Sequence, residues 1–197
     1  MSSTAQVPSP SRSKTSQKNE GNTVNVLTIV DTEAIKAVYP RNPNASKDNP
    51  TGLNHHEGIT MLCPASNYVG NINQDPANLE FKANVGDWIS FRATTLSKNA
   101  DDAVILYDVE SYNGKNVFNG FNATKETRTG AVVPDTTQQD GLPPKQQSVT
   151  FYSYDSKISN SGTETLKITF ALYVLDEDEE NQVIYDYFWW DPEIDVK

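Results

Sequence analysis

The sequence predicts an all-β fold, an antiparallel β-sandwich of about seven to nine strands with one short helix and long loops. Three observations predict it. Short runs of alternating or continuous apolar residues recur along the chain. Segments rich in Gly, Pro and Asn separate these runs. Start and stop signals for a helix occur together at one place, near the beginning of the apolar pattern.

The first part of the chain combines a polar segment, a strand and the helix. Residues 1–22 are rich in Ser, Thr, Gln, Lys and Pro and predict a disordered tail, because they cannot bury enough apolar surface to offset their ordering entropy. Residues 23–197 are expected to form a single β-sandwich domain. The run VNVLTIV predicts a strand over 24–30 that is covered on both faces. Asp31 or Thr32 can cap a helix over 32–38, and Pro40 prevents its continuation.

The rest of the chain alternates between predicted strands and loops. Polar composition predicts loops over 41–58, 67–78 and 123–147, the last with Pro134, Pro143 and Pro144. Strands are expected over 58–63, twice within 79–96 around a Gly86-Asp87 turn, and over 103–112, 148–158, 166–175 and 182–190.

The last two strands predict a hairpin around which the fold is organised. Residues 166–175 alternate between apolar and mixed side chains, and the acidic segment 176–181 turns the chain. The return strand, 182–190, carries more aromatic side chains than any other segment of the chain. Alternation puts Tyr185, Tyr187 and Trp189 on one face and Phe188 and Trp190 on the other. One set is expected in the core, and the other at a ligand or subunit contact.

Composition excludes several classes of partner. The net charge is −10, and an acidic surface repels both nucleic acid and anionic membranes. No run of apolar residues is long enough for a membrane span, and no secretory signal is recognisable, so we expect a cytoplasmic protein, with release by a non-classical route left open. A single cysteine, Cys63, excludes an internal disulfide and a cysteine-cluster metal site.

The aromatic return strand also predicts a ligand-binding site. Rings can stack on the apolar C–H surface of a sugar while nearby carboxylates take its hydroxyl groups. The candidate ligand-binding residues are Tyr187, Trp189, Trp190, Asp186, Asp191, His55 and His56. The alternative for the rings is core packing, which must hold for about half of them. The alternative for the two histidines is simple exposure in a loop, because neighbouring side chains of an extended segment point to opposite faces.

The acidic turn raises the question of a metal. Asp176 to Glu180 are five consecutive carboxylates, and calcium prefers several oxygen ligands, so Asp176 and Asp178 are candidate calcium ligands. The alternative is a solvated turn that discourages edge-to-edge aggregation. No other cofactor is predicted. The chain shows no recognisable set of nucleophile, base and orienting residue, so an enzyme is not expected, although a carboxylate-based enzyme stays as a minor alternative.

Several segments together resemble the bacterial AidA/PixA inclusion body protein family. They are VNVLTIVDTEAIKAVYPRNPNASKDNPTGLNH, VGDWISFRATTLS, VILYDV and the ending FALYVLD to YDYFWWDPEI, and the resemblance covers about 24–196. It implies a β-sandwich, no known catalysis and accumulation in cytoplasmic inclusions, often in bacteria that associate with hosts. It also implies glycan binding in some members, but no set of binding residues.

Two functions follow as expectations. The first is a non-enzymatic, lectin-like protein that binds carbohydrate on host or self surfaces. The second is a structural or storage protein that self-associates into cytoplasmic inclusions without a specific ligand. Both predict homo-oligomers, and in the first case multivalency would raise a weak single-site affinity by roughly 10²–10⁴.

Overall fold

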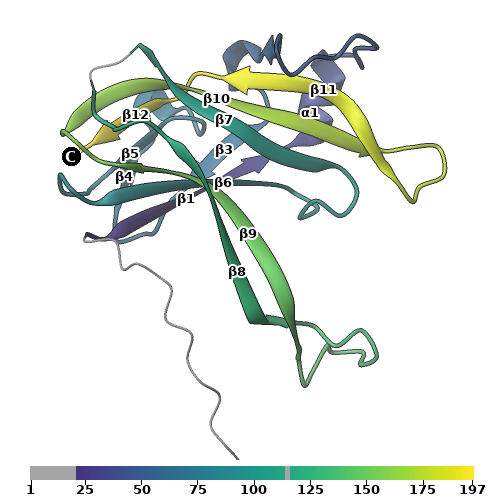
Figure 1. Cartoon of the computed structure of the whole chain (residues 1–197). Helices are drawn as coiled ribbons and strands as arrows, with labels where there is room; N and C mark the ends of the chain where they lie inside the picture. Colours follow the sequence, from purple (N-terminus) through teal and green to yellow (C-terminus); the bar gives the residue numbers. More distant parts are fainter. Residues whose placement is uncertain (1–20, 114–115) are drawn as a thin grey trace, which may run out of the picture.

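A computed structural model describes residues 21–113 and 116–197 of the chain. Two β-sheets pack face to face around a shared hydrophobic core (Figure 1), which confirms the predicted all-β sandwich. The described residues form twelve strands and one α-helix. The strands exceed the expected number of seven to nine because four strands lie outside the predicted ones. They are β2 (Thr51–Gly52), β4 (Tyr68–Gly70), β8 (Asn122–Val133) and β12 (Glu193–Val196). No helix in this part of the chain is long and apolar enough to span a membrane.

The strands divide between a five-stranded and a seven-stranded sheet. In order across it, the first sheet contains β3 (Ile59–Leu62), β1 (Thr23–Val30), β6 (Trp88–Thr95), β9 (Lys145–Lys157) and β8 (Asn122–Val133). The second contains β2, β11 (Gln182–Trp190), β10 (Gly162–Leu175), β12 (Glu193–Val196), β5 (Leu79–Phe81) and β4, and β7 (Ala103–Asn113) also pairs with β10. Most pairs are antiparallel, but β1 with β6, β2 with β11, and β5 with β12 are parallel.

The predicted helix is confirmed as α1 (Thr32–Val38). Asp31 caps its first turn, because a carboxylate oxygen accepts a hydrogen bond from the amide of Ala34 at 3.2 Å. Ile35 is completely buried and anchors the helix to the core. The helix ends at Val38, because the next residue, Tyr39, precedes Pro40 and is held in extended conformation.

The predicted hairpin of β10 and β11 is also confirmed, and it supplies much of the core. Leu166, Ile168, Phe170 and Leu172 on β10 are fully buried. Phe188 and Trp190 on β11 are fully buried as well, while Tyr187 and Trp189 on the opposite face are half-buried. The sequence places Tyr185 on that outer face too, but the β10–β11 register shifts beside it, and its half-buried ring packs against the core while its hydroxyl donates to the Tyr39 carbonyl at 2.7 Å. The period of two in the sequence therefore divides β11 between core and surface as expected from Asp186 to Trp190, and it fails at the bulge residue Tyr185.

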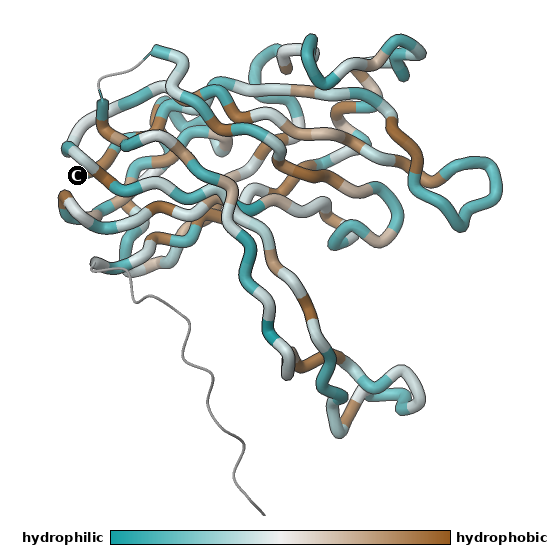
Figure 2. The backbone as a smooth tube through the Cα atoms, viewed as in Figure 1, coloured by the Kyte–Doolittle hydropathy of each residue, from teal (hydrophilic) through white to brown (hydrophobic). Residues whose placement is uncertain are grey.

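The predicted loop over 123–147 is wrong at both ends, and only residues 134–144 lie between strands. Asn122–Val133 form β8, which pairs antiparallel with β9. These two strands project away from the sandwich (Figures 1 and 2). Polar residues occupy both faces of β8, so it lacks the apolar alternation by which a half-buried strand is recognised.

Only the end of the predicted tail can be compared with the structure, because residues 1–20 lie outside the described residues. Asn22 is already joined to the sandwich. Its amide donates to a carboxylate oxygen of Asp87 at 2.8 Å, and its carbonyl accepts from the amide of Trp88 at 2.7 Å. The ordered chain therefore includes Asn22, directly before β1.

Candidate functional site

Four aromatic side chains gather on the face of the second sheet that points away from the core. They are Tyr107 and Tyr112 on β7 and Tyr187 and Trp189 on β11, and we call them the aromatic face. The rings meet in pairs across the intervening strand β10. Tyr107 and Tyr187 meet edge-to-face with ring centroids 5.7 Å apart, and Tyr112 and Trp189 are tilted with centroids 5.5 Å apart.

Two β-bulges place the tyrosines of β7 on this face. The pairing of β7 with β10 shifts by one residue twice, and the extra residues are Tyr107 and Tyr112. A bulge bends its strand and redirects the side chain of the extra residue. The sequence expectation did not include either tyrosine, because a bulge interrupts the period of two. Only the pairing of β7 with β10 reveals the two bulges.

Small side chains on β10 make room between the ring pairs. Thr169 lies opposite Trp189, and Ala171 lies opposite Tyr187, in the β10–β11 register. Both are on the outward side of the strand, yet they are almost completely buried, at 4% and 3% exposure. The aromatic rings on either side therefore cover the middle of the sheet, and the outer edges of the rings stay accessible.

Of the four aromatic residues, Trp189 contacts both Gly52 and the ammonium group of Lys167. Its indole lies against Gly52, where a Cβ atom would come within 3.0 Å of the ring, so only glycine fits at this position without displacing the ring. The ammonium group of Lys167 lies 5.7 Å from the ring centroid and pairs with Glu110 at 3.0 Å. The exposed part of the indole is thus bordered by one positive and one negative group.

A hydrogen bond to the loop before β2 fixes the position of the Tyr107 side chain. Its hydroxyl donates to the carbonyl of Lys47 at 3.0 Å. Burial, followed by the neighbouring Tyr187 and nearby carboxylates, raises the pKa of Tyr107 to about 12. The phenol therefore stays neutral and remains a hydrogen-bond donor at physiological pH.

Two of the predicted ligand-binding residues lie in the interior and not at the surface. Trp190 is completely buried and packs edge-on against Phe170 with centroids 5.8 Å apart, so it cannot reach a ligand in solution. Asp186 is 4% exposed, and its oxygens accept hydrogen bonds from the Tyr187 amide at 2.8 Å and the Thr51 hydroxyl at 3.4 Å. Both predictions fail because these residues belong to the inward-facing set of β11.

The two histidines have different surroundings, as adjacent residues commonly do. His55 is exposed. His56 lies between two carboxylates, with Nδ1 2.6 Å from Asp75 and Nε2 3.3 Å from Asp191. The structure thus joins the predicted residues His56 and Asp191, and adds Asp75, which the sequence expectation missed because it is 19 residues from His56. Both ring nitrogens are engaged, so neither is free to act as a general base.

The acidic turn is stabilised mainly by its own hydrogen bonds. Asp178 accepts from the amides of Glu180 at 2.7 Å and Asn181 at 3.0 Å. A hydrogen bond shared with Asp176, together with these amides, holds the pKa of the Asp178 carboxyl well below its usual range, and the same interaction raises the pKa of Asp176. Within the described ranges, no three His, Cys, Asp or Glu side chains are arranged to hold a metal ion. Calcium binding at this turn stays a prediction.

Comparison with known proteins places the chain in a family. No curated protein sequence matches it significantly. A crystal structure of an inclusion body protein (PixA) from Burkholderia cenocepacia is similar in fold, with a TM-score of 0.73 and 28% sequence identity over 93% of this chain and all of that one. The sequence model of the PixA inclusion body proteins matches residues 22–196. The chain therefore belongs to the PixA inclusion body protein family.

Proposed function

We propose that this protein binds carbohydrate without catalysis, and that the aromatic face is the binding site. The observation that carries the proposal is the arrangement of partly exposed ring pairs on the outer side of a rigid sheet. Tyr112 is 56% exposed, and Tyr107, Tyr187 and Trp189 are half-buried. Rings with one buried and one accessible edge offer an apolar surface at a small cost in conformational entropy.

The polar groups beside the rings suit a polyhydroxylated ligand. Lys167 can donate to a sugar hydroxyl, and Glu110 can accept from one, while both stay paired with each other at 3.0 Å. The small residues Thr169 and Ala171 keep the middle strand below the level of the rings. A ligand would therefore rest on Trp189 and Tyr112 and form hydrogen bonds at their border.

Catalysis is not part of the proposal. The one histidine with nearby carboxylates has both nitrogens engaged, and the family is described as inclusion body proteins, which names no reaction. His56 and Asp191 are proposed to support the loop around η1 (Asn54–His56), directly after β2, and so to keep Gly52 under Trp189.

A thermal-shift screen tests the proposal. The protein is melted with a panel of neutral, amino and acidic sugars, in calcium and again in chelator, because a ligand that binds only the folded state raises the midpoint. The same comparison tests calcium at Asp176 and Asp178. Any sugar that raises the midpoint is then titrated by calorimetry.

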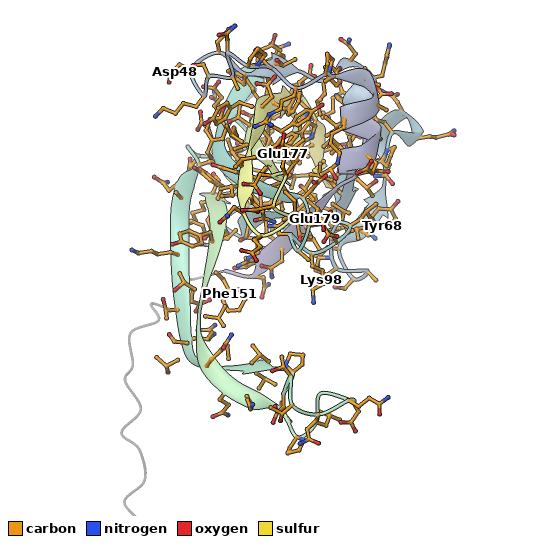
Figure 3. All side chains as sticks on the ribbon, turned by 90° about the vertical axis from the view of Figure 1, so that its right-hand side faces the viewer. Asp48, Tyr68, Lys98, Phe151, Glu177 and Glu179 are labelled. Atoms are coloured by element: carbon orange, nitrogen blue, oxygen red, sulfur yellow. The ribbon has the colours of Figure 1, made fainter. Side chains whose placement is uncertain are left out.

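Variants assign the binding to the aromatic face. Trp189→Ala is expected to weaken sugar binding about tenfold or more, as for a central ring in a binding site. Tyr68→Ala is the matched control, since Tyr68 is an exposed aromatic residue (Figure 3) on β4, at the opposite end of the sheet from β2. A panel without any hit, or equal binding by both variants, would contradict the proposal.

Family membership favours a second role, accumulation in cytoplasmic inclusions through self-association. The strong negative charge makes such packing sensitive to pH and salt, because repulsion between copies must be screened or neutralised. Light scattering at high protein concentration over about pH 4 to 8 tests this role. A monodisperse solution throughout would contradict it.

A further inference from the structure

The β8–β9 hairpin beyond Tyr154 has no packing partner among the described residues. We call residues 124–152 the arm. None of its residues is buried. β6 pairs with β9 only at Tyr154–Lys157, so the arm has no neighbouring strand on either side in the described chain. Figure 1 shows it extending away from both sheets.

The arm begins next to Tyr154, which still contacts the sandwich. The Tyr154 hydroxyl donates to the carbonyl of Tyr107, and this bond joins β9 to β7. From there Lys145–Ser153 of β9 extend about 30 Å, at roughly 3.3 Å per residue. Phe151 and Tyr152 lie along this length at 45% and 70% exposure, and Val132 near the tip is 67% exposed. Figure 3 shows the Phe151 side chain standing on the arm.

An isolated two-stranded ribbon of this kind is marginally stable in water. It orders two strands without burying a side chain, so little apolar burial offsets the entropy of ordering. Free strand edges also present unpaired amide and carbonyl groups that can pair with another strand. The arm therefore gains stability if a second surface covers it.

The net charge of the arm indicates which kind of molecule can cover it. The arm contains Lys125, Arg128 and Lys145 against Glu126, Asp135 and Asp140, so it is neutral, while the whole chain has a net charge of −10. Two acidic bodies repel each other, but two neutral arms do not. The arm therefore offers a place where copies of this chain can meet without bringing their acidic surfaces together.

We propose that a second copy of this chain pairs with the arm, β8 against β8, in antiparallel orientation. Charge selects the register. Pairing centred on Lys125 or Glu126 places like charges opposite each other, which destabilises a sheet. Pairing centred on Thr127 places Glu126 opposite Arg128 of the other copy, twice by symmetry. Within one chain these two side chains already share a face of β8 and lie 2.5 Å apart, so both charges point to the same side.

This pairing uses residues outside the aromatic face, and it does not depend on sugar binding. It would join the two five-stranded sheets through their edge strands β8 and leave both aromatic faces on the assembly. If sugar binding occurs, the same contact makes the protein bivalent. Failure of the sugar screen would leave the pairing intact, and a monomeric protein could still bind a sugar.

Charge reversal in the arm tests the contact. The full chain is expected to sediment as a dimer, whereas E126R alone and R128E alone place like charges at both pair positions and are expected to be monomeric at the same concentration. An equimolar mixture of the two variants restores opposite charges and is expected to form the mixed dimer. Circular dichroism and melting of each variant confirm that folding is unchanged, since both residues are exposed.

Disulfide trapping tests the register without changing charge. In a C63S background, T127C lies on the proposed twofold axis, and mild oxidation is expected to convert most of it to a covalent dimer. V85C, at a site 60% exposed on the sandwich, is the control that is expected to stay monomeric. A monomeric wild-type chain, charge variants that still dimerise, or equal cross-linking of T127C and V85C would overturn the proposal. Covering of the arm by a different protein would appear as the first of these outcomes.

Discussion

The β10–β11 hairpin and the β8–β9 arm are both long antiparallel strand pairs, but they have opposite relations to the core. Every second residue of β10 from Leu166 to Leu172 is fully buried, and β11 adds Phe188 and Trp190. No residue of the arm is buried. Strand pairing alone therefore does not create a core. A strand contributes to the core only where a second sheet covers one of its faces.

The two hairpins also use their outer faces differently. On the outer face of the β10–β11 hairpin, the middle residues of β10 are small, and the rings of β11 and of the neighbouring strand β7 shield Thr169 and Ala171 from water. On the arm, large residues such as Phe151 and Tyr152 stand among charged and hydroxyl side chains and are exposed, at 45% and 70%. The first surface is built within one chain, and the second is the surface that we propose a second copy of the chain covers.

The largest expected difference between the two regions is in the cost of removing a ring. Phe170 is fully buried, with its ring centroid 5.7 Å from Phe188, so F170A leaves a cavity and is expected to lower the free energy of unfolding by about 3–5 kcal/mol. F151A in the arm is expected to change it by less than about 0.5 kcal/mol. Chemical denaturation of dilute protein measures both, and equal losses would mean that the arm folds against the sandwich.

A carboxylate at the start of β6 is expected to have the next largest effect. Asp87 accepts hydrogen bonds from the amides of Asn84 at 2.9 Å and Asn22 at 2.8 Å, and these lower the pKa of its carboxyl below the usual 3.8. Asp87 itself is buried, and D87N replaces one of its charged acceptor oxygens by a donor, so it is expected to cost about 1–3 kcal/mol at neutral pH.

The same variant has a predictable pH dependence. Because the folded-state pKa of Asp87 is lowered, its stabilisation is fully present above the unfolded-state pKa and is lost as the pH falls through the folded-state value. The stability difference between wild type and D87N should therefore be constant from about pH 7 to 5 and shrink below about pH 4. Melting curves over this range test it, and a constant difference down to pH 2 would disprove the assignment to Asp87.

The smallest expected effect on stability comes from removing one threonine hydroxyl in each region. Thr169 is 4% exposed, and its hydroxyl donates to the Asp108 carbonyl at 3.1 Å, so T169V is expected to cost about 0.5–1.5 kcal/mol. Thr150 in the arm shares a 2.8 Å hydrogen bond with Thr127, but both are exposed, and water replaces the bond in T150V at a cost below about 0.5 kcal/mol. A larger loss for T150V, growing with protein concentration, would instead reveal a covered arm.

Much of the fold could be predicted from local patterns. Asp31 and Pro40 bounded the helix, and the alternation within 182–190 separated Phe188 and Trp190 from Tyr187 and Trp189. The candidate site was predicted in part. Tyr187 and Trp189 lie on the outward face as expected, whereas Trp190 and Asp186 are buried. Tyr107 and Tyr112 could not be predicted, because a bulge depends on how two strands align and leaves no periodic signal.

By itself the sequence determined the class of fold, the helix, the closing hairpin and the acidic character of the surface, because these follow from the order of neighbouring residues. Only the tertiary structure decided that β7 crosses beside β10 with two bulges, that His56 lies between Asp75 and Asp191, and that β8 and β9 leave the sandwich as an arm. These features depend on contacts between residues far apart in the chain. A strand such as β8, with polar residues on both faces, has no sequence pattern that identifies it as a strand or indicates its partner. Its pairing with β9 is seen only in the folded structure.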